Sequence, residues 1–99
     1  GGLDKAVIAA TIAKYLSQVR ACYEQGLRRN PAMAGQVLMA FEIGGTGKLN
    51  FAKPAKSSLG DAEVPECIAQ RMMGWDFPKP IGGVNVKVSY PFLLRPVNG

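Results

Sequence analysis

Two cysteines, Cys22 and Cys67, are the residues of this chain best suited to covalent or metal chemistry. The chain has no histidine, so the usual base that activates a cysteine nucleophile is missing. Zinc sites use clusters of ligands with short gaps, which two distant cysteines do not form. A disulfide and a pair of buried thiols therefore stay open. We favour the disulfide, because both cysteines flank the apolar stripes of predicted helices that pack on one sheet face, and it requires Cα atoms within about 7 Å.

Three acidic residues, Asp61, Glu63 and Glu66, lie close together in the sequence. Such a cluster can suggest an acid–base pair or a metal site. Acidic side chains are also typical of the first turn of a helix, where they interact favourably with the helix dipole. We adopt this second interpretation, and we expect no catalytic residue, no metal, no cofactor and no enzymatic activity.

The glycine-rich stretch Gly44–Gly47 matches the Gly-x-x-Gly loop of KH domains, which clamps a nucleic-acid backbone. In KH domains this loop joins two helices, whereas here it lies between two predicted strands and is typical of a hairpin. The net charge is +5, and six of the twelve basic residues precede residue 51. Because this charge is scattered and forms no basic stripe, a nucleic-acid-binding module is only the alternative function, and we expect no nucleic-acid partner.

Periodicity predicts five elements within one domain of 99 residues. Apolar residues spaced by threes and fours predict a continuous helix over about 4–29 and a second helix over 61–74. Strands are predicted over 36–43 and 48–53, joined by the glycine-rich turn. In the last strand, 84–92, every second residue is apolar, which indicates one buried face.

This order, α-β-β-α-β, predicts an α+β fold with a three-stranded antiparallel sheet. The third strand fits beside the first, giving the spatial order 2-1-3, because the first strand is apolar on both faces and the last contains Pro91. We expect both helices to cover one sheet face, formed by Val37, Met39, Phe41, Val84, Val86, Val88 and Phe92.

The last strand is then an edge strand, which must be either protected or used for pairing. An extended segment of another protein can pair with such an edge through main-chain hydrogen bonds. We therefore predict a partner-binding edge consisting of Val84, Asn85, Val86, Lys87, Val88, Ser89 and Tyr90. Self-pairing into a homodimer through the same edge stays open.

Several short motifs follow one another along the chain. They are Cys22-Tyr23, Asn30-Pro31, Gly35-Gln36-Val37, Gly47-Lys48-Leu49, Cys67-Ile68, Trp75-Asp76-Phe77-Pro78 with Pro80, and Tyr90-Pro91-Phe92. In this order they resemble the C-terminal domain of TonB-type energy transducers, over about residues 3–95. Within that family the chain is most similar to the two-cysteine version in the AgmX/GltJ-type gliding-motility proteins of myxobacteria.

The resemblance implies a periplasmic domain at the end of a protein anchored in the inner membrane. Such a protein couples a proton-driven inner-membrane motor to partners in the outer membrane or periplasm. In that family the closing strand binds an extended peptide by strand addition, which corresponds here to residues 84–90. The start Gly1-Gly2 agrees with a single domain, residues 1–99, excised from a longer protein, and no apolar run approaches the length of a membrane span.

Overall fold

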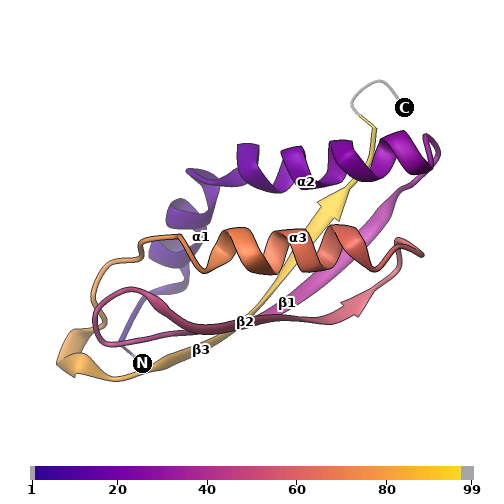
Figure 1. Ribbon diagram of the computed structural model, residues 1–99. Helices are drawn as coiled ribbons and strands as arrows, with labels where there is room; N and C mark the ends of the chain where they lie inside the picture. Colours follow the sequence, from indigo (N-terminus) through magenta and orange to yellow (C-terminus); the bar gives the residue numbers. More distant parts are fainter. Residues whose placement is uncertain (1, 97–99) are drawn as a thin grey trace.

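The computed structural model describes residues 2–96 and contains a three-stranded sheet, three α-helices and one short 3₁₀ helix (Figure 1). The elements in chain order are α1 (Lys5–Ala13), α2 (Leu16–Arg29), β1 (Gly35–Ile43), β2 (Leu49–Ser57), α3 (Glu63–Met72), η1 (Ile81–Gly83) and β3 (Val86–Leu94).

The sheet is antiparallel with the order β2-β1-β3, so the predicted fold class and strand order are confirmed. β1 lies in the centre and pairs with both neighbours. A tight turn joins β1 to β2, in which the Gly44 N–H donates to the carbonyl oxygen of Lys48 at 2.8 Å. Gly47 takes a positive φ of 91° in this turn, a conformation that glycine adopts without strain.

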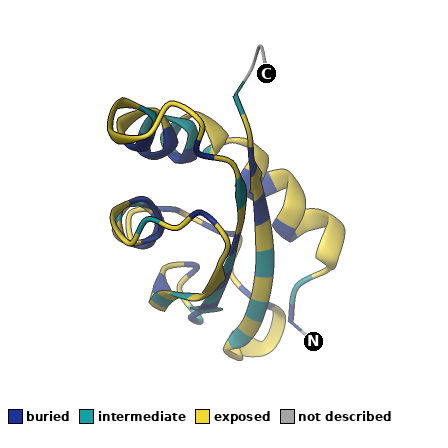
Figure 2. Ribbon diagram, turned by 90° about the vertical axis from the view of Figure 1, so that its right-hand side faces the viewer, coloured by how far each residue is buried: buried dark blue, intermediate teal, exposed yellow. Residues whose placement is uncertain are grey.

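Helices α2 and α3 lie on the same side of the sheet, where they cover the buried side chains of β1 (Figure 2). Trp75 is fully buried in this core and stacks on Tyr15, with ring centroids 4.9 Å apart. The edge of Phe92 meets the same tryptophan at 6.4 Å, which ties β3 to the helical layer. The largest completely buried side chains are Trp75, Tyr23, Phe41, Ile12, Met39, Ile43, Ile68 and Met72.

The prediction of one continuous helix over residues 4–29 is wrong, because the helix is interrupted at Lys14 and Tyr15. Here the N–H groups of both residues donate to carbonyl oxygens three positions earlier, which is the tighter 3₁₀ pattern. The Tyr15 side chain is fixed from outside the helix, since it stacks on Trp75 and its hydroxyl accepts the N–H of Asp76 at 3.1 Å. The break gives α1 a direction different from that of α2 (Figure 1).

The closing strand is also displaced from its predicted bounds, since it covers residues 86–94 instead of 84–92. Its partner β1 determines this change: pairing begins at Val86, opposite Ile43, and continues to Leu94, opposite Gly35. Val84 precedes the strand and is 47% exposed, so the prediction that it belongs to the covered sheet face is wrong. Leu94, which lies beyond the predicted end of the strand, is buried.

Candidate functional site

The free edge of β3 presents backbone groups that have no partner strand in the described sheet. The Ser58 N–H donates to the Gln36 carbonyl oxygen at 3.0 Å, so the backbone of Gln36 faces β2. The N–H and C=O groups of successive residues point to opposite sides of a strand. Therefore the N–H and C=O groups of the odd-numbered residues of β1 face β3. Each of these pairs with an even-numbered residue of β3. The odd-numbered residues of β3, including Lys87 and Ser89, consequently direct their N–H and C=O groups outward.

Pro91 falls in this outward-facing set, opposite Leu38. Its missing N–H therefore removes no hydrogen bond from the sheet, which is the position where an edge strand accepts proline. An incoming strand would find N–H donors at Lys87 and Ser89 but none at Pro91. The usable part of the edge thus begins at the start of β3 and ends near Pro91.

A groove of about 520 Å³ follows this part of the edge, between α1 and β3. The β3 side of the groove consists of residues 86–90. The opposite side is formed by Leu3 and by α1 residues Lys5, Ile8 and Ala9. Apolar side chains from both sides meet a strand with unpaired backbone groups, so the groove suits an extended peptide with apolar side chains.

The seven predicted edge residues occupy three different environments. Val86, Val88 and Tyr90 are half-buried and direct their side chains toward the helices, packing against the core. Lys87 and Ser89 alternate with them and are exposed. Val84 and Asn85 lie before β3 and do not belong to the paired strand, so these two are the part of the predicted site that the structure does not place on the edge.

The α1 side of the groove was not predicted from the sequence. Ile8 lies within the single helix predicted over 4–29, and that prediction gives no reason to place it beside the last strand. The aromatic residue that marks the break between α1 and α2 is Tyr15. Its apolar spacing continues that of the helix, so the spacing alone does not reveal the break. Leu93 was also missed; it lies in β3 and is 74% exposed.

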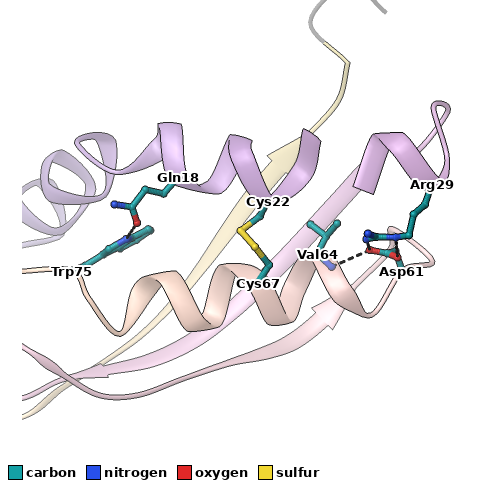
Figure 3. The surroundings of a disulfide bond; sticks show 7 residues. All are labelled: Gln18, Cys22, Arg29, Asp61, Val64, Cys67 and Trp75. Carbon is teal, nitrogen blue, oxygen red and sulfur yellow. Dashed lines mark hydrogen bonds and ion pairs between the residues drawn. A yellow bond between two sulfur atoms is a disulfide. The ribbon is translucent and has the colours of Figure 1, made fainter. Parts of the chain in front are cut away.

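The disulfide between Cys22 and Cys67 is present, so the favoured interpretation of the two cysteines is confirmed. The sulfur atoms are 2.06 Å apart and the Cα atoms 5.7 Å apart. Figure 3 shows that this bond joins α2 to α3 in the middle of the helical layer. Since it lies in the layer that covers the sheet and not at the edge, its role is to hold the two helices together.

Two polar contacts flank the disulfide and connect the same two parts of the chain (Figure 3). At one end, the buried Trp75 donates its Nε1–H to Oε1 of Gln18 at 2.9 Å. At the other end, the Arg29 guanidinium donates to the Asp61 carboxylate at 2.9 Å. That hydrogen bond lowers the pKa of Asp61, and the N–H of Val64, which donates to the same carboxylate at 2.9 Å, adds to the effect.

Two properties of the described residues, 2–96, bear on other classes of function. They contain no group of three or more histidine, cysteine, aspartate or glutamate side chains that could hold a metal ion. None of the helices within this range is long and apolar enough to cross a membrane.

Comparison with known proteins gave no match: no family model, no curated protein and no solved structure resembles this chain closely enough to be reported.

Proposed function

We propose that this domain is a periplasmic interaction domain of a TonB-like energy transducer, in a machine of the gliding-motility type. It binds an extended segment of an outer-membrane or other envelope protein, which adds as a fourth strand beside β3. The rest of the protein, anchored in the inner membrane, connects the domain to a proton-driven motor. The domain itself is not an enzyme.

One observation carries this proposal: β3 pairs with β1 along nine residues without a register shift, and its outer side faces the groove with α1. A regular strand offers its outward N–H and C=O groups at even spacing, which is what strand addition requires. The disulfide supports the proposed compartment, since disulfides persist in oxidising environments such as the periplasm.

The groove also predicts the pattern of the bound segment. Alternate side chains of an added strand would point into the groove toward Ile8, Val86 and Val88, and these should be apolar. The side chains between them would lie beside Lys87 and Ser89 and should be polar.

Site-specific photo-crosslinking in the native cell tests the proposal. A photoreactive residue replaces Lys87 or Ser89, with Asn85 as a third position just before the strand and exposed Gln70 on α3 as the control. We expect one envelope protein to be captured from the two strand positions and not from Gln70. Products that contain only this chain would assign the edge to a homodimer, and equal capture from Gln70 would contradict the proposal.

A further inference from the structure

The face of the sheet that α2 and α3 leave open has an ordered arrangement of charge. The strand register places Lys53, Ala40 and Ser89 in one row across the sheet. The next row consists of Lys56, Leu38 and Pro91. Small or apolar side chains thus occupy the centre of this face, and lysines occupy its β2 margin. A third lysine, Lys87, lies on the β3 margin opposite Glu42.

None of these three lysines forms an ion pair within residues 2–96. The ion pairs in this part of the chain involve Arg29 and Lys48, whose partners lie in the α3 region and in the loop that follows it. The one carboxylate on the open face, that of Glu42, accepts a hydrogen bond from Asn50 Nδ2 at 2.9 Å. The open face is therefore positive, with the charge of Lys53 and Lys56 concentrated along β2.

The same face exposes apolar side chains that a partner could bury. Leu93 is 74% exposed and Phe51 is 36% exposed, and Leu38 lies half-buried between the margins. Two shallow hollows on this face are lined by residues of the three strands together with Ser58. Three strands span roughly 10 Å, which is close to the diameter of one α-helix, about 10 Å.

We propose that this open face is a second interaction surface, which binds an acidic amphipathic helix of a partner protein. The apolar side of such a helix would cover Leu38 and Leu93, and acidic residues on its flank would pair with Lys53 and Lys56. This surface does not depend on strand addition, because Lys53 and Lys56 lie on the opposite edge strand from β3.

A helix fits these observations better than a single-stranded nucleic acid or a lipid surface. Single-stranded nucleic acids stack successive bases on several aromatic side chains, whereas Phe51 is the one aromatic residue in the open-face rows that the register defines. A lipid surface would be bound mainly through charge and would not need a face matched in width to a helix.

The experiment measures binding of a synthetic helical peptide of about four turns, with leucines on one side and glutamates on both flanks. The double variant Lys53→Glu/Lys56→Glu should weaken binding of this peptide at least tenfold. The matched control, Lys14→Glu/Arg71→Glu, changes the net charge equally at exposed positions of the helical layer. It should alter the affinity by less than about threefold, since well-separated surface charges are screened by salt.

Two further measurements decide the outcome. Amide chemical shifts of Ala40 and Ser89 should change on addition of the peptide, while those of α2 and α3 should not. Equal weakening by the two double variants, shifts confined to the helices, or tighter binding of random single-stranded DNA or anionic vesicles than of the peptide would overturn the proposal. Lys87 lies on the margin of this face as well as on the β3 edge, so photo-crosslinking at Lys87 alone does not separate the two surfaces. The Lys53→Glu/Lys56→Glu variant does separate them, because both lysines lie on β2, at the opposite edge of the sheet. This variant should lose the helical peptide but keep the partner that is captured at the β3 edge.

Discussion

The two edges of the sheet differ in a way that separates a closed edge from an open one. The pairing of β2 with β1 has two register shifts, opposite Leu38/Met39 and opposite Glu42/Ile43 of β1, and β2 contains Pro54. β3 pairs with the same central strand over its full length without a shift. Bulges and proline hinder the addition of another strand, so β2 is protected where β3 is regular. On β3, Pro91 lacks an N–H and would restrict an added strand to the part of the edge before it, and the proposed strand addition requires only that part.

The largest effect should come from removing the disulfide, which joins α2 to α3 in the helical layer. Replacing both cysteines, Cys22→Ala with Cys67→Ala, opens a loop of 45 residues. Chain entropy predicts a loss of roughly 4 kcal/mol in the free energy of unfolding, measured by urea denaturation. Reduction of the unmodified protein serves as the control and should give a similar loss. Photo-crosslinking from Lys87 in the folded variant should persist, and its disappearance would show that the β3 edge depends on the disulfide.

The second prediction compares one aromatic residue from each edge strand. Phe92 on β3 is 3% exposed and contacts Trp75, so Phe92→Ala should lower the free energy of unfolding by about 3 kcal/mol. Phe51 on β2 is 36% exposed, and Lys53 Nζ lies 5.6 Å from its ring centroid. Phe51→Ala should therefore cost about 1 kcal/mol or less. Similar losses in denaturant titrations of the two variants would contradict the view that β3 is the strand fastened to the core.

The third prediction concerns the outward N–H of Ser89. Ser89→Pro removes this donor and should reduce capture of the partner from Lys87 about tenfold, in proportion to one lost backbone hydrogen bond and a hindered approach. Ser89→Ala keeps the N–H and removes only an exposed hydroxyl, so it should leave capture nearly unchanged. If the two variants behave alike, the partner contacts side chains and does not add a strand.

The general form of β3 could be predicted from the sequence, whereas its limits could not. The alternation from Val86 to Phe92 is a property of neighbouring residues, and this is why the strand, the sheet order and the covered face, apart from Val84, were predicted correctly. The bounds depend on where β1 ends, at Ile43, which no residue within the last strand encodes. The break at Tyr15 likewise depends on Trp75 and Asp76, which lie far away in the sequence. The groove could not be predicted, because it exists only when α1 turns away from α2.

The smallest effect concerns Asp61, which lies between β2 and α3. Its carboxylate accepts hydrogen bonds from the Arg29 guanidinium and from the N–H of Val64 at the start of α3. Asp61→Ala should lower the free energy of unfolding by about 1 kcal/mol, as for the loss of a helix-capping side chain, whereas Asp61→Asn keeps an acceptor for the Val64 N–H and should cost less.

The pKa of Asp61 is lowered in the folded state, so its contribution to stability is fully present above the unfolded value of about 3.9. It is lost as the pH falls through the lowered folded value. Urea titrations between pH 6 and pH 2 should therefore show a smaller acid-induced loss in Asp61→Ala than in the unmodified protein. An unchanged pH profile would contradict a stabilising role of the Arg29–Asp61 ion pair in the folded state.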